Sequence, residues 1–302
     1  MASATSPVLA LVGPTASGKT GLALGVAGSR PGPVELVAVD AFTVYRGMDI
    51  GTAKPTPAER GDVPHHLVDV LDPDEDVSVA WFQTQARAVV DEVLGRGATP
   101  LLVGGSGLYF RAVVDDLRFP PTDPDVRAGL EERWADRPRA AWAHLEERDP
   151  DAAARIDPGN LRRTVRALEV LELTGERFSS FRASWDTYAS SRYPGLDVAY
   201  LEPPTAELRA AIRDRSRRMV AAGLLDEARD LRARFGALSS TARQAIGYQE
   251  ALAVLDGDLA EDDLAGAVAD RTWAYARRQR SWFRRDPRCT PTSPAEVLTR
   301  WT

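Results

Sequence analysis

Cysteine and histidine are scarce in this sequence, and each scarcity excludes a class of site. The chain of 302 residues has one cysteine, Cys289, and three histidines. A single cysteine cannot form a disulfide within the chain. One cysteine and three histidines are also too few for us to expect a structural zinc site. The first residues show no basic segment followed by an apolar stretch, and no apolar run is long enough to cross a membrane. We therefore expect a cytoplasmic protein with no membrane association and no metal other than Mg²⁺.

Lysine is also nearly absent. Lys19 and Lys54 are the only two lysines among 38 basic residues, so that the rest are arginine. The formal net charge is −6, which argues against a uniformly basic surface. The arginines are nevertheless clustered, with seven of them and a single acid, Asp286, between Arg271 and Arg288. One face of an acidic protein can therefore still meet a polyanion.

The stretch GPTASGKT has the spacing of a phosphate-binding loop. An apolar run over residues 7–12 precedes it as an expected buried strand, and a helical stretch follows from Leu22. The backbone N–H groups of such a loop converge on an anion, a lysine adds charge and a hydroxyl can bind Mg²⁺. The expected phosphate-binding residues are Gly13, Pro14, Thr15, Ala16, Ser17, Gly18, Lys19 and Thr20. The loop alone does not identify the ligand, for which ATP is the obvious candidate.

Two further strand ends carry polar side chains. Asp40 ends LVAVD, and Ser106 follows the glycine pair of LLVGGSGLY. Because parallel strands bind ligands at their carboxyl ends, both should lie near the phosphate loop. Asp40 could contact Mg²⁺ through water, act as a general base, or cap a turn. Ser106 could cap a helix, contact an anion, or do both.

Strands alternating with helices in the first third predict an α/β fold with a P-loop NTPase-like parallel sheet and helices on both faces. The expected strands are 8–12, 35–39, 100–103 and 197–201, with a helix over 78–96. Residues 115–194 show only helical patterns: Asp123-Pro124 caps one helix, Pro138 starts another, and a third runs from Asn160 to Thr174 and is closed by Gly175. We therefore predict a core of residues 1–114 and 195–302 interrupted by an all-helical insertion.

Arginines recur at helical spacing in three places. Arg162 and Arg166 share a face with Arg163 beside them, which suits nucleic-acid phosphates or a solvated face paired with Glu169. The pair Arg213 and Arg217 is similar. A third group alternates with aromatics that could stack on bases or belong to the core: Arg277, Arg280 and Arg284, with Trp273, Tyr275, Trp282 and Phe283. The loop Tyr45 to Pro55 is as compatible with a structural turn as with a binding loop.

Taken together, GPTASGKT, VDAFTVYRGMDIGTAKP, LLVGGSGLYFRA, RRTVRALEVLELTG, AIGYQE and RRQRSWFRR occur in an order and spacing similar to the tRNA dimethylallyltransferases. The resemblance covers nearly the whole chain. It implies transfer of a dimethylallyl group from dimethylallyl diphosphate to N6 of the adenosine 3′ of the anticodon. It further implies that the loop and Arg215 bind the donor diphosphate with Mg²⁺ on Thr20, and that Asp40, Lys19, Ser106 and Arg215 are catalytic.

The resemblance also implies a monomer that binds the tRNA anticodon stem-loop, with the target adenosine splayed out of its loop. The implied tRNA-binding residues are Asp40, Ala41, Phe42, Thr43, Ser106, Arg127, Arg162, Arg163, Arg166, Gln244, Gly247 and Tyr248. Ala41 and Thr43 stand where many relatives have Ser and Gln, so base contacts from these two positions differ here.

Three alternatives share parts of this pattern. An adenylate isopentenyltransferase acting on free AMP or ATP has the same phosphate loop, but needs no helical insertion with arginines. A small-molecule kinase would use ATP, with Asp40 as the base for a hydroxyl. A non-catalytic RNA-binding protein would have no use for a phosphate loop beside a strand-end aspartate.

Overall fold

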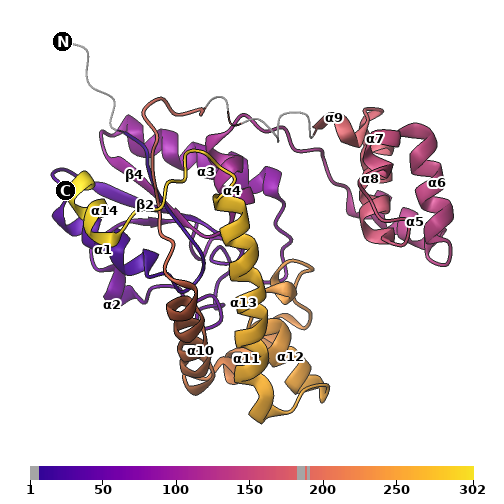
Figure 1. Ribbon diagram of the computed structural model, residues 1–302. Coiled ribbons are helices and arrows are strands. Elements are labelled where there is room, and N and C mark those ends of the chain that lie inside the picture. The colour runs from indigo at the N-terminus through magenta and orange to yellow at the C-terminus, as the bar shows by residue number, and fades with distance from the viewer. Residues whose placement is uncertain (1–6, 182–187, 189–190) are drawn as a thin grey trace. The chain divides into compact units, whose positions relative to one another are not determined.

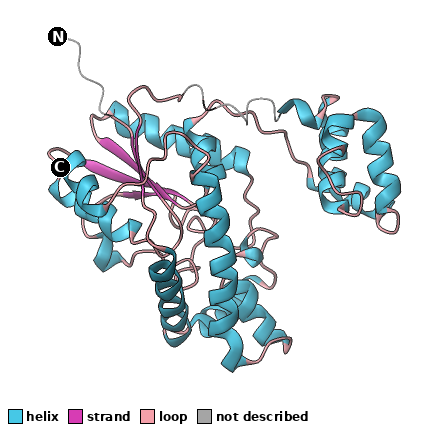
Figure 2. Ribbon diagram, in the orientation of Figure 1, coloured by secondary structure: helices cyan, strands magenta, loops and turns pink. Residues whose placement is uncertain are grey.

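The centre of the protein is a sheet of five parallel strands in the order β3-β2-β4-β1-β5 (Figure 2). The computed structural model describes residues 7–181, 188 and 191–302. The strands are β1 (Leu9–Val12), β2 (Val34–Val39), β3 (His65–His66), β4 (Thr99–Gly104) and β5 (Asp197–Tyr200). The α/β prediction is confirmed, and four of the strands lie within a residue of their expected positions.

Strand β3 was not expected, and its composition explains why. It consists of two histidines that pair through their backbones with Leu36 and Val37 at the edge of the sheet. The other four strands are runs of mostly apolar, buried residues, as is typical of strands covered on both faces. A two-residue polar edge strand carries no such pattern.

The described residues form two compact units. One contains residues 7–77, 82–114 and 193–302, and the other contains residues 78–81, 115–181, 188, 191 and 192. The helices of the first unit (Figure 1) are α1 (Lys19–Ser29), α2 (Pro57–Arg60), α3 (Val79–Gly95), α4 (Gly107–Val114), α10 (Thr205–Ala221), α11 (Leu224–Phe235), α12 (Tyr248–Asp256), α13 (Leu264–Phe283) and α14 (Pro294–Trp301), with 3₁₀ turns at Ala242–Gln244 and Glu261–Asp263. Helices α10 and α13 pack against each other.

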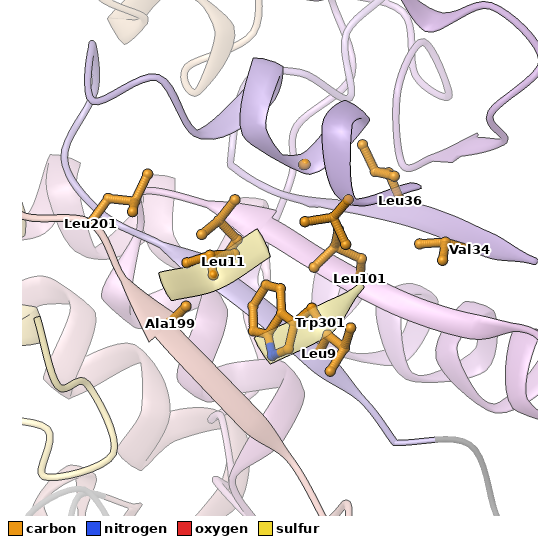
Figure 3. Packing of buried hydrophobic residues seen from close by; sticks show 11 residues of the cluster. Leu9, Leu11, Val34, Leu36, Leu101, Ala199, Leu201 and Trp301 are labelled. Carbon is orange, nitrogen blue, oxygen red and sulfur yellow. The ribbon is translucent and has the colours of Figure 1, made fainter. Parts of the chain in front are cut away.

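One face of the sheet is covered by the first and the last helix of the chain (Figure 3). Leu9 and Leu11 of β1 point to this face because side chains alternate along a strand. Trp301 of α14 is 2% exposed, and its Nε1 donates a hydrogen bond of 2.8 Å to Oδ2 of Asp197. Ala23, Val26 and Val297 complete the contact, so the first and the last helix of the folded core meet on the same face of the sheet.

The second unit is helical, with α5 (Pro124–Trp134), α6 (Pro138–Arg148), α7 (Pro150–Ala153), α8 (Leu161–Thr174) and α9 (Phe178–Phe181). Its start signals act as expected: the Asp123 carboxylate accepts from the amides at the start of α5, and Asn160 caps α8. Gly175 ends α8 with a left-handed φ of 71°. The unit has a core of its own, formed by Leu130, Ala141, Leu145, Ala152, Ala153, Ile156, Val165, Ala167, Leu168 and Leu171.

Among the described helices, none combines the length and the apolar character needed to span a lipid bilayer.

Candidate active site

The phosphate loop leaves the end of β1 and turns directly into α1. Ala16 and Gly18 have positive φ angles of 62° and 82°, the left-handed conformation found in loops whose backbone amides bind anions. Gly13 is required by space, because a Cβ there would lie 2.6 Å from the carbonyl oxygen of Leu201. The loop therefore ends at a helix N-terminus, where amides and the helix dipole favour an anion.

Lys19 is the charged group of this loop. Its Nζ donates to the carbonyl oxygen of Pro14 at 2.6 Å and to Oγ of Ser17 at 3.4 Å. Burial, and then the charge of Arg215, lower the pKa of Lys19 to about 7, while Asp40 opposes the change. At neutral pH Lys19 is therefore only partly protonated when no anion is bound. A bound anion would raise its pKa and favour the charged ammonium form.

Asp40 follows β2 and faces the same space. Its Oδ1 accepts a hydrogen bond of 2.8 Å from the amide of Phe42, so the residue also caps its own turn. Burial raises the pKa of Asp40, against the opposing effects of the Phe42 amide and of Lys19 and Arg215. A carboxylate made more basic by burial and pointing into a cleft suits a general base.

Arg215 lies on α10 and completes a triangle of charges with Lys19 and Asp40. Its Nη2 donates to the carbonyl oxygen of Thr52 at 3.5 Å. Burial lowers the pKa of Arg215, and Asp40 counters this. Arginine stays charged in spite of such a shift, because its ordinary pKa is so high.

Asp40, Arg215 and, from the phosphate loop, Thr15 line a cleft that is open to solvent. Its walls come from the phosphate loop, the loop after β2, and helices α10 and α13. The lining residues are Thr15, Asp40, Phe42, Gly51, Thr52, Arg215, Ser216, Met219, Ala245, Ile246, Val268, Thr272 and Tyr275. The mixture of charged groups with an apolar wall suits a ligand with an anionic end and an apolar body.

Ser106 stands at the end of β4, where the chain passes very close to β2. A Cβ at Gly104 would lie 2.1 Å from the carbonyl oxygen of Val39, so only glycine fits there. Oγ of Ser106 accepts from the amide of Tyr109 at 3.4 Å, in the manner of a helix cap. The capping role is therefore present, and the ligand contact of Ser106 stays a prediction.

Gln279 was not among the expected site residues. It is 4% exposed on α13, and its Oε1 accepts a hydrogen bond of 2.9 Å from the amide of Thr15 in the phosphate loop. Its other end approaches Gly105, where an added Cβ would lie 2.3 Å from Nε2. The available signal was a polar residue in register with the buried Thr272, Ala276 and Phe283 of the same helix.

Two tyrosines also border Asp40. Burial and the Asp40 charge raise the pKa of Tyr275 and of Tyr109, so both hydroxyls stay protonated at neutral pH. Tyr275 lines the cleft, while Tyr109 packs edge-on against Phe82 at 4.7 Å between ring centroids. The aromatic residues of α13 differ in role, since Phe283 is buried in the core and Trp282 is 38% exposed.

The loop from Tyr45 to Pro55 is a structural turn whose backbone also borders the cleft. Lys54 is buried, and its Nζ donates to Asp49 at 2.9 Å, to Asp69 at 2.6 Å and to the carbonyl oxygen of Tyr45. These bonds fix the shape of the turn. Gly51 and Thr52 of the same loop line the cleft.

Arginines of the second unit fall into two groups. Arg166 and Arg127 pair with the fully buried carboxylate of Glu169 at 2.8 and 2.9 Å, and Arg166 also donates to the carbonyl oxygens of Pro120 and Pro121. The ion pairing considered for this patch is therefore present at Arg166. Arg162 and Arg163 are exposed and remain available to a ligand.

The expected RNA-binding residues near α12 also include both exposed and buried positions. Gln244 is exposed, but Gly247 and Tyr248 are buried. The Tyr248 hydroxyl donates to Glu227 and accepts from the amide of Gly51 at 3.2 Å. Tyr248 thus holds a loop in the described conformation, and we do not retain it as an RNA contact.

The arginine stripe of α13 is likewise partly engaged within the protein. Arg280 and Arg284 both pair with Glu202, at 2.9 and 2.6 Å. Arg277, the third arginine of this stripe, does not pair with Glu202. We therefore do not interpret this stripe as a base-stacking surface.

The residues at the phosphate loop fit a divalent cation bound together with a phosphate ligand. Among the described residues there is no group of three or more His, Cys, Asp or Glu side chains that could hold a metal by itself. Mg²⁺ often uses one or two protein oxygens, several waters and substrate phosphates instead. Thr20 is exposed at the start of α1 and offers a suitable hydroxyl.

Comparison with known proteins agrees with this geometry. The family model described as "IPP transferase" matches residues 43–286. A tRNA dimethylallyltransferase of Kineococcus radiotolerans is 52% identical over 289 residues, which are 93% of this chain and 89% of the relative. One from Bifidobacterium longum is 46% identical, covering 94% and 85%.

Solved structures are also similar. A tRNA isopentenylpyrophosphate transferase from Bacillus halodurans has a TM-score of 0.69 and 37% identity, covering 98% of this chain and 94% of that chain. A eukaryotic dimethylallyltransferase described as acting on tRNA has a TM-score of 0.77 and 25% identity, covering 92% and 70%.

Proposed function

We propose, because this chain belongs to the IPP transferase family, that it transfers a dimethylallyl group from dimethylallyl diphosphate to N6 of the adenosine 3′ of the anticodon in tRNA. The products are N6-dimethylallyladenosine and diphosphate. The observation that carries the proposal is the cluster of three charged side chains at the phosphate loop: Asp40 and Arg215 line one cleft, and Lys19 interacts electrostatically with both.

The cationic side of the cleft suits the leaving group. As the lone pair of N6 forms a bond to C1 of the dimethylallyl group, the C1–O bond breaks and its electron pair stays on the diphosphate. Lys19, Arg215 and the loop amides would stabilise this growing negative charge. Mg²⁺ held by Thr20 and the diphosphate oxygens would neutralise further charge on the leaving group.

Asp40 suits the acceptor side. The exocyclic amine must lose a proton as its bond to carbon forms, and Asp40 would take it. Burial raises the pKa of Asp40, which increases its strength as a base. Tyr275 and Phe42 line the same cleft and offer aromatic surface to a splayed-out adenine.

Several residues would bind the tRNA anticodon stem-loop. Arg162 and Arg163 on α8 offer charge to backbone phosphates, and Gln244 offers an amide. Ala41 and Thr43, beside Asp40, would face the bases without the longer side chains of many relatives. Arg166 and Arg127 would act through Glu169, which they hold in place.

The deciding experiment supplies the protein with radiolabelled dimethylallyl diphosphate and Mg²⁺. Unmodified tRNA with adenosines after its anticodon is offered in one reaction, and AMP in another. We expect label on the tRNA alone, and its loss when the target adenosine is replaced by guanosine. Label on AMP would instead indicate an adenylate isopentenyltransferase, and ATP hydrolysis without prenyl transfer would indicate a kinase.

A further inference from the structure

We infer that Glu227 on α11 is a positioning residue for the cleft, acting through the loop Asp49–Thr52 on Arg215. The inference rests on the proposed function for its catalytic consequence. Oε2 of Glu227 accepts from the amides of Asp49 at 3.1 Å and Ile50 at 3.0 Å. Its Oε1 accepts from Ile50 at 3.0 Å and from Gly51 at 3.5 Å. Three successive amides thus converge on one carboxylate.

These amides form the kind of concave arrangement that binds an anion. In this protein the anion is supplied by a helix distant in sequence. Lys54, which follows the loop, pairs with the carboxylates of Asp49 and Asp69. Asp49 is therefore held twice, through its amide by Glu227 and through its carboxylate by Lys54.

Tyr248 of α12 contacts both Glu227 and the loop. Its hydroxyl donates to Glu227 and accepts from the amide of Gly51. An added Cβ at Gly51 would lie 2.3 Å from the Tyr248 ring, and one at Gly247 would lie 3.4 Å from Cα of Gly51. Gly51 therefore packs closely against both Gly247 and the ring of Tyr248.

The held loop forms part of the cleft. Gly51 and Thr52 line it, and the carbonyl oxygen of Thr52 accepts from Nη2 of Arg215. Arg215 is the cation expected to bind the donor diphosphate. Release of the loop would therefore move an acceptor of Arg215 as well as a wall of the cleft, while leaving Lys19 and Asp40 in place.

The test compares Glu227→Gln with the matched control Asp226→Asn. Asp226 is the preceding residue of α11, is exposed, and pairs only with Arg229 among the interactions described for it. The Gln side chain keeps the shape of Glu227 but loses the charge that attracts three amides. Hydrogen exchange of residues 45–55 reports the loop directly, and titration with inorganic diphosphate reports Arg215 without needing tRNA.

In Glu227→Gln we expect exchange of the 49–51 amides to rise on the order of tenfold, because local opening becomes easier. We expect kcat/KM for dimethylallyl diphosphate to fall by about ten- to a hundredfold, as for a misplaced catalytic group, with tRNA affinity unchanged. Diphosphate affinity should fall in parallel, and Asp226→Asn should match wild type. Tyr248→Phe removes the two hydrogen bonds of the hydroxyl, to Glu227 and from the Gly51 amide, but keeps the Glu227 charge, and it should change the same quantities less.

Exchange at 49–51 as slow as in wild type would overturn the inference. So would faster exchange accompanied by unchanged diphosphate affinity, since the loop would then not act on Arg215. If Glu227→Gln does not fold, Tyr248→Phe decides in the same way. A wild-type protein that binds diphosphate but transfers no prenyl group would refute the proposed function, while the exchange and diphosphate results would still decide the role of Glu227.

Discussion

At the scale of single residues, the site depends on charges that burial has shifted away from their ordinary behaviour. Lys19 and Asp40 are held near each other with pKa values moved in opposite directions, the lysine downward and the aspartate upward. Both pKa values are thereby moved toward neutral pH. A group whose pKa lies near the working pH gains or loses a proton easily, which suits proton transfer and anion binding. Both residues were identifiable from the sequence, but their shifted pKa values were not.

Asp40→Asn should lower the turnover of prenyl transfer on the order of a hundredfold or more, because a lost general base costs about that much. Affinity for tRNA should stay nearly unchanged, since the amide keeps the shape of the side chain. Single-turnover rates at saturating tRNA measure the first quantity and filter binding the second. Unchanged turnover would remove Asp40 from the mechanism.

Lys19 should give diphosphate binding a characteristic pH dependence. The free protein has a Lys19 pKa of about 7, and a bound anion raises it, so binding above this pH requires uptake of a proton. The Kd of inorganic diphosphate should therefore rise up to about tenfold per pH unit above pH 7. Lys19→Arg stays charged and should lack this component. Diphosphate itself ionises in the same way in experiments with wild type and with Lys19→Arg. The difference between their calorimetric pH curves therefore isolates the contribution of Lys19. Parallel curves for the two proteins would contradict this prediction.

At the scale of elements, α8 combines a buried structural face and an exposed basic face. Glu169 faces inward and joins the start of α5, whose Asp123 amide donates to Oε1 of Glu169 at 2.8 Å. Arg162 and Arg163 face outward. Helical spacing predicted that Arg162 and Arg166 share a face, but could not show that Arg166 turns toward Glu169 and the backbone of Pro120 and Pro121.

Replacing Arg162 and Arg163 together by alanine should weaken tRNA binding and flatten its salt dependence. Each lost phosphate contact removes about 0.7 to 0.9 from the slope of log K against log salt, so two should remove about 1.5. The control removes the same charge from α6, as Arg139→Ala with Arg148→Ala. A slope equal to that of wild type would place the tRNA elsewhere on the protein.

Most of the fold could be predicted because its elements carry strong local signals. The apolar strands, the cap at Asp123 and the stop at Gly175 each depend on neighbours in the sequence. The residues that were missed act over long sequence distances. Gln279 reaches Thr15, and Glu227 reaches the loop at Asp49, through contacts that no local pattern encodes.

At the scale of the whole molecule, the last helix stabilises the first strand. Trp301 is buried against Leu9 and Leu11 and is hydrogen-bonded to Asp197 of β5 (Figure 3). Trp301→Ala should lower the free energy of unfolding by about 3–5 kcal/mol, the usual cost of truncating a large buried aromatic side chain. Denaturant unfolding would measure this, with Leu298→Ala, a 36% exposed neighbour, as control. A Trp301→Ala loss as small as that expected for an exposed side chain would show that Trp301 contributes little to this core.

The strand order also determines when the site can form during protein synthesis. β1 emerges from the ribosome first, yet it lies between β4 and β5, and β5 is made only after the entire helical unit. The loop after β1 then waits further for α13, which carries Gln279. A nascent chain therefore holds an unsupported phosphate loop through most of its translation. The enzyme acquires its anion-binding site only as the ribosome approaches the end of the message.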